Sequence, residues 1–400
     1  MSAPDGLVDT KAATDLLMRL LAVEGVTGHE GAIGKAVIEA LVAVGVPRKL
    51  IRVDNANKEI PLPTETGNLI VTLPGTRPGP RLLFSTHLDT VPLCAGAVPV
   101  RSKDRIASKG DTALGGDNRT GCAALVTLAA TLLKHQLPHP PLTLLFTVRE
   151  ESGLFGARYL DPKDLSGPVM GFNIDGRLAS EICVGAVGAE RWEVEIFGKA
   201  SHAGVHPEKG ISASMVASLA LAEVHTGGWF GKVKKGTSEG SSNVGSIAGH
   251  DGRSAGEATN VVTDYVLIKG EARSHDARFF KEITKQYAAA FHNAAGKVTD
   301  DKGKIAKVRF RSRLDYYPFR LKPSAAVVRH AETAARSIGL TSTLRIGNGG
   351  LDANWLVRHK VPTVTFGAGQ NNIHTVDEYV DLKLFEEGCR MAVAVAALAS

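Results

Sequence analysis

Apolar and polar positions alternate with two different periods along the first part of the chain. Short apolar runs rich in β-branched residues, typical of buried strands, are separated by segments whose apolar residues recur at helical spacing. The runs predict strands at residues 50–54, 68–73, 81–86, 142–148 and 169–174. The helical spacing predicts helices at residues 10–23, 31–44 and 122–134. This alternation is typical of an α/β sheet whose functional site lies at one edge.

The pattern changes between residues 188 and 318, where the strands become longer and amphipathic. Strands are predicted at residues 191–197, 242–247, 259–274 and 305–315, and helices at residues 211–224 and 276–295. This βαββαβ order predicts a small ferredoxin-like α+β domain. Within it, the Gly- and Ser-rich segment 227–242 is expected to be a mobile loop.

The α/β pattern then resumes and continues to the end of the sequence. Helices are predicted at residues 324–338, at 351–359 and from 382, with strands near Leu344 and at 363–366. We therefore expect a catalytic domain formed by residues 1–188 and 319–400, interrupted by an inserted domain at residues 189–318. Near its start, Thr27 and Glu30 are spaced like a capping box for the helix 31–44.

Length, charge and cysteine usage narrow the class of protein. A chain of 400 residues is too long for one ordinary core. A net charge of +6, with Lys and Arg scattered, argues against nucleic-acid binding. The four cysteines form no CxxC pair, which is typical of reduced thiols. The sequence has no signal-peptide pattern and no apolar run long enough for a bilayer, so we expect a cytoplasmic protein with no membrane partner.

Two adjacent carboxylates, Glu150 and Glu151, follow the predicted strand 142–148. Side by side at a strand end they repel each other, and each loses solvation if the site is buried. The pair makes chemical sense if one glutamate binds a cation and the other carries a proton. An ordinary solvated loop is the alternative that this stretch alone leaves open.

Other polar side chains also stand at strand ends or in the turn before a helix. In the extended segment His87-Leu88-Asp89 the outer residues face the same way, so Asp89 can brace the His87 ring. With Asp89 as brace and Glu150 as proton carrier, two imidazoles and three carboxylates remain, a set suited to two Zn²⁺, Co²⁺ or Mn²⁺ ions. These candidate ligands are His87, Asp117, Glu151, Asp175 and His374.

The motifs STHLDTVP, LGGDNRTG, TVREESGLFGA, GKASHAGVHPEKGISA and IHTVDEYV are specific in combination. Through them nearly the whole chain resembles the di-zinc metallopeptidases that include peptidase T, aminoacylase-1 and carboxypeptidase G. The spacing and Asp175 are most similar to the peptidase T-like tripeptide aminopeptidases. The resemblance implies a zinc-peptidase fold with a central mixed sheet flanked by helices, and an inserted lid and dimerisation domain.

The resemblance also implies a role for each residue of the predicted site. Asp117 would bridge two zinc ions, and Asp89 would orient one of the imidazoles. Glu150 would be the general base that takes a proton from the metal-bridging water and returns it to the leaving amine. The remaining ligands would be His87 and Asp175 at one ion, and Glu151 and His374 at the other.

In the inserted domain, His202 of the Ser-His-Ala-Gly motif matches the histidine that polarises the scissile carbonyl, often across a dimer. Asn260 and Arg273 resemble substrate-binding residues, with Arg273 suited to a peptide carboxylate; an ion pair of Arg273 with Glu271 or Asp276 is equally compatible with the sequence. Gly349 lies in a loop that resembles the family's glycine-rich substrate loop, although Leu351 replaces its usual small polar residue.

We therefore expect a metal-dependent aminopeptidase that hydrolyses short peptides, most simply tripeptides, with a homodimer through the inserted domain as its expected assembly. An N-acyl amino acid amidohydrolase or a carboxypeptidase on the same scaffold is the first alternative. A peptide-binding protein with a degenerate metal site is a second. A third is the di-zinc aminopeptidase architecture that forms large hollow assemblies, which lacks the Ser-His-Ala-Gly motif.

Overall fold

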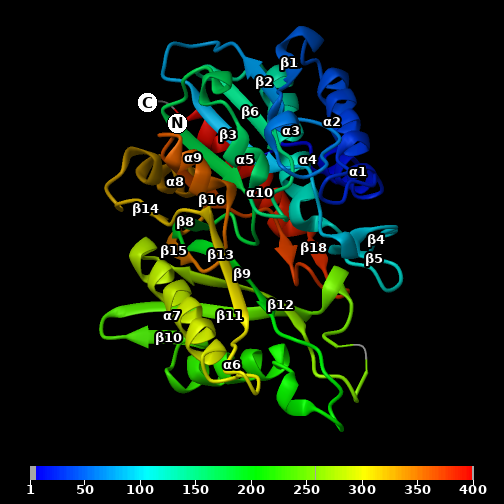
Figure 1. The fold of residues 1–400 in the computed structure, drawn as a ribbon. Coiled ribbons are helices and arrows are strands. Elements are labelled where there is room, and N and C mark those ends of the chain that lie inside the picture. Colours follow the sequence, from blue (N-terminus) through cyan, green and yellow to red (C-terminus); the bar gives the residue numbers. More distant parts are fainter. Residues whose placement is uncertain (1–5, 257, 399–400) are drawn as a thin grey trace. The chain divides into compact units, whose positions relative to one another are not determined.

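The computed structural model describes residues 6–256 and 258–398. The chain forms two compact units, one from the segments up to Ala186 and from Phe319 onward, the other from Val187–Pro318. The first junction lies slightly before the expected one at residues 188/189, and the second coincides with the expected one. Each unit is described separately below and can be followed by colour in Figure 1.

The first unit is built on a nine-stranded mixed sheet. Four neighbouring strands, in the order β6, β3, β7 and β16, run parallel, and the strands on both flanks include antiparallel pairs. The expected mixed sheet is thereby confirmed. The order is β1 (Ile51–Val53), β2 (Leu69–Leu73), β6 (Leu142–Thr147), β3 (Leu82–His87), β7 (Met170–Ile174), β16 (Thr363–Phe366), β8 (Glu181–Ala186) and β14 (Phe319–Arg320), with β15 (Thr343–Gly347) paired to β8.

Successive side chains of the central strands enter two different cores, as the two-residue period of a strand requires. Leu83 and Leu145 lie in a cluster with Leu356, whereas the adjacent Phe84 and Leu144 lie in the large cluster. The longer helices that contribute buried residues to the large cluster are α1 (Thr10–Leu21), α2 (Gly31–Ala43), α4 (Gly116–His135), α8 (Ala326–Ser337) and α10 (Leu382–Ala397). The shorter helices are α3 (Ala56–Glu59), α5 (Phe155–Tyr159) and α9 (Asp352–Arg358). Burial on both faces explains the nearly continuous apolar runs of the sequence.

A small four-stranded sheet was not predicted. Its strands have only two to four residues each, too few to show an alternating pattern. They are β17 (Gln370–Asn371), β18 (Tyr379–Asp381), β5 (Arg105–Ser108) and β4 (Pro99–Arg101), in that order. The sheet has a functional consequence, because β17 and β18 fix both ends of the loop that carries His374.

The second unit is a five-stranded antiparallel sheet with two helices, in the strand order β10-β11-β12-β9-β13. The predicted βαββαβ succession is present, with β10 as an extra edge strand. The elements are β9 (Gly188–Phe197), α6 (Ala213–Thr226), β10 (Gly231–Lys235), β11 (Ser238–Ala248), β12 (Tyr265–Ser274), α7 (Ala277–Ala295) and β13 (Lys307–Tyr316). The second unit has its own core, in which the rings of Trp192 and Tyr287 pack with centroids 4.5 Å apart and planes tilted by 35°.

The prediction of a mobile loop at residues 227–242 was wrong. This segment forms β10 and the start of β11, a hairpin that pairs Lys232 with Ser241 and Lys234 with Glu239. Only one side chain of β10, Val233, is buried, so the strand lacks the apolar alternation that a sequence reading needs. Pairing with β11 stabilises it instead.

The predicted capping box at the start of α2 was also wrong. The N-cap residue Glu30 makes no side-chain cap hydrogen bond. The Thr27 hydroxyl donates to Ser152 Oγ at 2.9 Å, and Glu30 Oε1 accepts from the backbone N–H of Gly28 at 2.7 Å. Thr27 is therefore bound to the turn after β6 and Glu30 to a backbone group of its own loop, and neither side chain caps the helix.

The cysteines Cys94, Cys122, Cys183 and Cys389 are all free, in agreement with the expected reduced thiols. Across the two described stretches, 6–256 and 258–398, no helix combines the length and hydrophobicity needed to cross a membrane.

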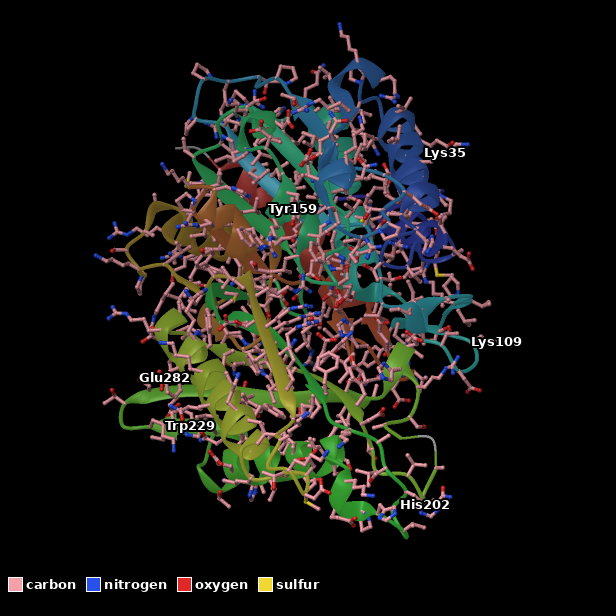
Figure 2. The ribbon with its side chains drawn as sticks, viewed as in Figure 1. Lys35, Lys109, Tyr159, His202, Trp229 and Glu282 are labelled. Carbon is pink, nitrogen blue, oxygen red and sulfur yellow. The ribbon has the colours of Figure 1, made fainter. Side chains whose placement is uncertain are left out.

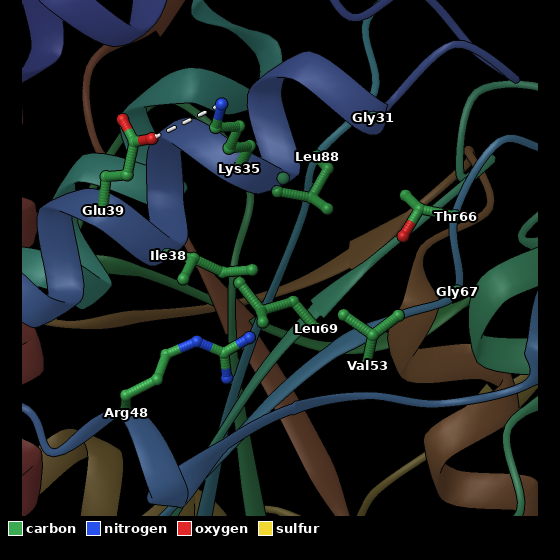
Figure 3. A pocket seen from close by; sticks show the side chains of 11 residues that line it. Gly31, Lys35, Ile38, Glu39, Arg48, Val53, Thr66, Gly67, Leu69 and Leu88 are labelled. Carbon is green, nitrogen blue, oxygen red and sulfur yellow. Dashed lines mark ion pairs between the residues drawn. The ribbon is translucent and has the colours of Figure 1, made fainter.

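A groove of about 340 Å³ lies along α2 in the first unit. Ile38 and Leu69 form its apolar wall, and Lys35 and Glu39, whose charged groups are 3.9 Å apart, line it further along α2 (Figure 3). Gly34 of α2 also lines the groove. A Cβ added to Gly34 would lie 3.8 Å from Leu88 Cδ1, an ordinary contact distance.

Gly34→Ala is therefore expected to raise the free energy of unfolding by about 0.5–1 kcal/mol, since alanine loses less backbone entropy than glycine in a helix. Urea unfolding followed by circular dichroism measures this change. Gly121→Ala in α4 is the contrasting variant, because its Cβ would lie 2.5 Å from Asn118 Oδ1 and 2.7 Å from the Ile174 carbonyl oxygen. A destabilised Gly34→Ala protein would contradict the packing described for α2.

Candidate active site

Three parallel neighbours of the large sheet carry most of the candidate site at their carboxyl ends. His87 is the last residue of β3. Glu150 and Glu151 follow β6, and Asp175 follows β7 directly. Because β6, β3 and β7 lie side by side and parallel, their carboxyl ends meet at one edge of the sheet. The strand order therefore brings together residues far apart in the sequence.

Asp117 lies between the two candidate imidazoles. Its Oδ1 is 3.0 Å from His87 Nε2, and its Oδ2 is 3.3 Å from His374 Nε2. His374 Nε2 also lies 3.0 Å from Glu151 Oε1, and His87 Nε2 lies 4.0 Å from Asp175 Oδ1. Each oxygen of Asp117 thus faces one imidazole, and each imidazole faces one further carboxylate.

The backbone before Asp117 is held by Glu378. Glu378 Oε2 accepts from the backbone N–H of Leu114 and of Gly115, both at 2.8 Å, and Oε1 accepts from that of Asp117 at 3.0 Å. Gly115 has φ 83°, a left-handed conformation that favours glycine. Glu378 therefore supports the turn that carries Asp117.

Asp89 contacts both His87 and the glutamate pair. His87 Nδ1 lies 2.9 Å from the main-chain oxygen of Asp89 and 3.4 Å from its Oδ1. The two carboxylate oxygens accept from the backbone N–H of Glu150 at 2.9 Å and of Glu151 at 3.1 Å. Asp89 therefore fixes the imidazole mainly through its carbonyl, while its side chain holds the turn of the two glutamates.

The cluster has an excess of buried negative charge. Burial raises the pKa of Glu150 and of Asp175 well above the ordinary range, and neighbouring carboxylates add to the effect. Burial also raises the pKa of Glu151 to about 7, with the charge of Asp117 contributing. Hydrogen bonds to Asp117 and Glu151 raise the pKa of His374 to about 10. The raised pKa values of the carboxylates and of the His374 imidazole both indicate that negative charge is in excess at the site and that positive charge is lacking.

These residues fit a metal centre. Ligand atoms of His87, Asp117 and Glu151 all lie within 4.8 Å of one another. Contact of His87 Nδ1 with the Asp89 carbonyl leaves Nε2 directed at Asp117, as in metal-binding histidines. Imidazole nitrogen and carboxylate oxygen are the donors that Zn²⁺ and similar ions prefer. Bound cations would also neutralise the surplus of carboxylates.

Two further polar residues at this site were not predicted. Gln370 Nε2 donates to Asn118 Oδ1 at 3.0 Å and lies 3.4 Å from Asp175 Oδ1. Asp352, the first residue of α9, is buried and accepts from the Thr147 hydroxyl, and burial raises its pKa to about 6. Asp352 could have been found from the sequence, because it lies in the glycine-rich loop motif. No sequence motif pointed to Gln370.

In the second unit, His202 lies on an exposed loop (Figure 2). Its Nδ1 accepts from the backbone N–H groups of Gly204 and Val205, both at 3.2 Å, so its neutral ring carries the proton on Nε2. The main-chain oxygen of Asn260 accepts from Ala203 N at 2.8 Å, which places Asn260 beside the Ser-His-Ala-Gly motif. The side chain of Asn260 is exposed.

Arg273 of β12 forms the ion pair that the sequence left open as an alternative. Its Nε and Nη2 lie 2.8 and 3.1 Å from the two carboxylate oxygens of Glu271. In the first unit, Gly349 is exposed between β15 and α9, and a Cβ added there would meet no atom within 4 Å.

The carboxylate–imidazole cluster is typical of a metal-dependent hydrolase, and a comparison of sequences gives the family of the chain. The profile of peptidase family M20/M25/M40 matches residues 83–398, so the chain belongs to this family. An uncharacterised protein of Bacillus subtilis strain 168, YqjE, is 32% identical over 97% of this chain and 98% of its own length.

Two solved structures confirm the resemblance to peptidase T. The aminopeptidase PepT of Bacillus cereus is 30% identical, with a TM-score of 0.82 and coverage of 98% of this chain and 99% of that one. A tripeptidase of Staphylococcus aureus is 28% identical, with a TM-score of 0.86 and the same coverage.

Proposed function

We propose that this peptidase is a metal-dependent aminopeptidase that removes the N-terminal residue of tripeptides. The observation that carries the proposal is the position of Asp117, whose two oxygens face His87 and His374 at 3.0 and 3.3 Å. One shared carboxylate between two imidazoles is the ligand arrangement of a two-metal hydrolase. The likeness to PepT and to the S. aureus tripeptidase over nearly the whole chain supports tripeptides as the substrate class.

Two divalent cations, Zn²⁺ or alternatively Co²⁺ or Mn²⁺, would be held by the five candidate ligands. Asp117 would serve both ions, with His87 and Asp175 at one and Glu151 and His374 at the other. When bound, the cations polarise the scissile carbonyl and lower the pKa of water.

Glu150 is proposed as the general base. Its side chain is only 9% exposed, and the backbone N–H of residue 150 is held by Asp89 at 2.9 Å. Burial raises the pKa of Glu150, so its carboxylate accepts a proton more readily than that of a solvated glutamate. Glu150 takes a proton from the attacking water and gives it to the amine that leaves.

His202 is proposed to stabilise the developing oxyanion. Because Nδ1 accepts two backbone hydrogen bonds, the Nε2–H group of the neutral ring remains as a donor. The family resemblance, in which this histidine often acts across a dimer, supports a homodimer through the second unit. Arg273 and Asn260, also of the second unit, and Gly349 of the first are proposed as substrate-binding residues on the same resemblance.

The test compares a tripeptide that has a free α-amino group with its N-acetylated form. An aminopeptidase site pairs the ammonium group, so acetylation is expected to lower kcat/KM by about 100-fold or more. Product analysis by mass spectrometry should show a free N-terminal amino acid and a dipeptide. Faster cleavage of the acetylated form would indicate an amidohydrolase, and release of the C-terminal residue would indicate a carboxypeptidase. The absence of turnover with every added metal would favour a peptide-binding protein.

A further inference from the structure

Three successive backbone N–H groups of the glutamate turn, residues 149–151, donate to carboxylates from the N-terminal part of the chain. Glu30 Oε1 accepts from Arg149 N at 3.1 Å. Asp89 Oδ1 and Oδ2 accept from Glu150 N and Glu151 N at 2.9 and 3.1 Å. All three backbone N–H groups of residues 149–151 are therefore hydrogen-bonded to carboxylates. The two residues that supply these carboxylates, Glu30 and Asp89, lie more than fifty positions apart in the sequence.

This turn needs support because its backbone is in an unfavourable conformation. Arg149 has φ 52°, in the left-handed region, which is unfavourable for a non-glycine residue. The Arg149 side chain is fixed as well, since its Nε donates to Thr64 Oγ1 at 2.7 Å. The backbone N–H of Leu154 donates back to the Glu150 carbonyl at 2.8 Å and closes the turn.

Glu30 is an unusual residue to find in this position. It is completely buried, and no ion pair accompanies it among the interactions described for it. Oε1 accepts from Gly28 N at 2.7 Å as well as from Arg149 N, whereas Oε2 has no hydrogen-bond partner among the described residues. Burial of a carboxylate without a cation is costly. A residue kept at that cost calls for a role beyond filling the core.

The segment that carries Glu30 contacts the turn at a second point. The Thr27 hydroxyl donates to Ser152 Oγ at 2.9 Å, one residue beyond the glutamate pair. The loop of residues 27–30 therefore contacts both ends of the turn. This explains why Thr27 and Glu30 are spaced like a capping box yet do not cap α2.

We propose that Glu30 is a positioning residue for the general base Glu150. By accepting the Arg149 N–H it fixes the residue before the base, and Asp89 fixes the base and the residue after it. This inference rests on the proposed function, since it takes Glu150 as the proton carrier. An error of about 1 Å in the place of a catalytic group can cost about 100-fold in rate.

The experiment compares three substitutions of Glu30 with wild-type enzyme loaded with zinc. Glu30→Ala removes the acceptor and is expected to lower kcat by about 100-fold, with KM and two zinc ions per subunit unchanged. Glu30→Gln keeps an oxygen for the Arg149 N–H and should retain kcat within about fivefold of wild type. Glu30→Asp keeps the carboxylate, but its shorter side chain places the oxygens farther from the Arg149 N–H, so kcat should fall by about tenfold.

Glu65→Ala is the matched control. The Glu65 carboxylate accepts from Gly31 N at 3.1 Å, next to Glu30 in the sequence, and no contact of Glu65 with residues 149–151 is described. It should leave kcat unchanged.

Several outcomes would overturn the inference. One is a Glu30→Ala enzyme that unfolds at a lower temperature but has normal kcat per folded molecule, which would indicate a purely structural role. Another is an active Glu30→Asp with an inactive Glu30→Gln, which would show that charge matters and the acceptor does not. If Glu30→Ala does not fold, the comparison of kcat between Glu30→Gln and Glu30→Asp tests the inference, which requires Glu30→Gln to be the more active of the two. Normal activity of Glu150→Ala would instead contradict the proposed function itself.

Discussion

Glu150→Ala is expected to lower kcat by about 100- to 10,000-fold, the range that a positioned general base contributes. Glu150 is not among the proposed metal ligands, so zinc content should stay at the wild-type level. The Glu150 backbone N–H still donates to Asp89 in the variant, so the turn should keep its shape. Steady-state kinetics with a tripeptide, together with metal analysis of the same preparation, measures both quantities.

Ser152→Ala is the control for this variant. Ser152 lies in the same turn, and its hydroxyl contacts Thr27 and Arg149. It should change kcat by less than about tenfold, because removal of one such hydrogen bond costs about 1 kcal/mol. A Glu150→Ala enzyme with near-normal turnover would show that another group carries the proton. A large effect of Ser152→Ala would show that the turn, not the Glu150 carboxylate, limits the rate.

The main features of the site could be predicted because neighbouring parallel strands bring the polar residues at their carboxyl ends together. His87, Glu150, Glu151 and Asp175 each follow an apolar run, and parallel neighbours bring such residues to one edge. The apolar alternation of the strands, with Phe84 in one core and Leu83 in the other, gives a strong local signal. These parts of the prediction depended only on local patterns.

The contacts that the sequence could not reveal act over long separations. Glu378 holds the backbone near Asp117 from more than 250 positions away, and Glu30 holds Arg149 from more than 100. Such contacts join a side chain to a backbone group, and a backbone group leaves no trace in the sequence. Gln370 likewise reaches Asn118 from a two-residue strand that no periodicity could reveal.

Local patterns also misled where a distant partner was stronger than the local one. The spacing of Thr27 and Glu30 fits a capping box, but Ser152 and Arg149 take their side chains. For Arg273 the sequence left a peptide carboxylate and an ion pair with Glu271 or Asp276 equally open, and the structure shows the pair with Glu271. For Thr27 and Glu30, local spacing indicated side chains able to form hydrogen bonds but could not indicate their distant partners.

The site therefore has two layers of carboxylates with different tasks. Asp117, Glu151 and Asp175 face the imidazoles with their oxygens. Asp89 and Glu378, in contrast, use both carboxylate oxygens to accept backbone N–H groups. Asp89 holds the turn that carries Glu151 in this way, and Glu378 holds the turn that carries Asp117. Loss of a residue from the second layer should weaken catalysis through geometry, whereas loss from the first should remove metal.

Asp117→Ala is expected to have the largest effect on metal binding. Asp117 is the proposed ligand common to both ions, so its loss weakens two sites at once, and zinc content should fall from two ions per subunit to less than one. Peptidase activity should fall with it by about 1,000-fold or more, because cation polarisation of the carbonyl and activation of water are both lost. Emission spectrometry of the purified protein and isothermal titration with ZnCl₂ measure the binding.

The comparison that makes this result specific is Asp377→Ala. Asp377 is exposed, lies three positions after His374, and is not a proposed ligand. It should bind two zinc ions with wild-type affinity. Thermal unfolding gives an independent measure: zinc at about 100 times its dissociation constant should stabilise the wild type by about 2.7 kcal/mol per site and Asp377→Ala equally, but not Asp117→Ala. If Asp117→Ala bound two ions as tightly as the wild type, the carboxylate between His87 and His374 would not be the bridge, and the proposed metal centre would be wrong.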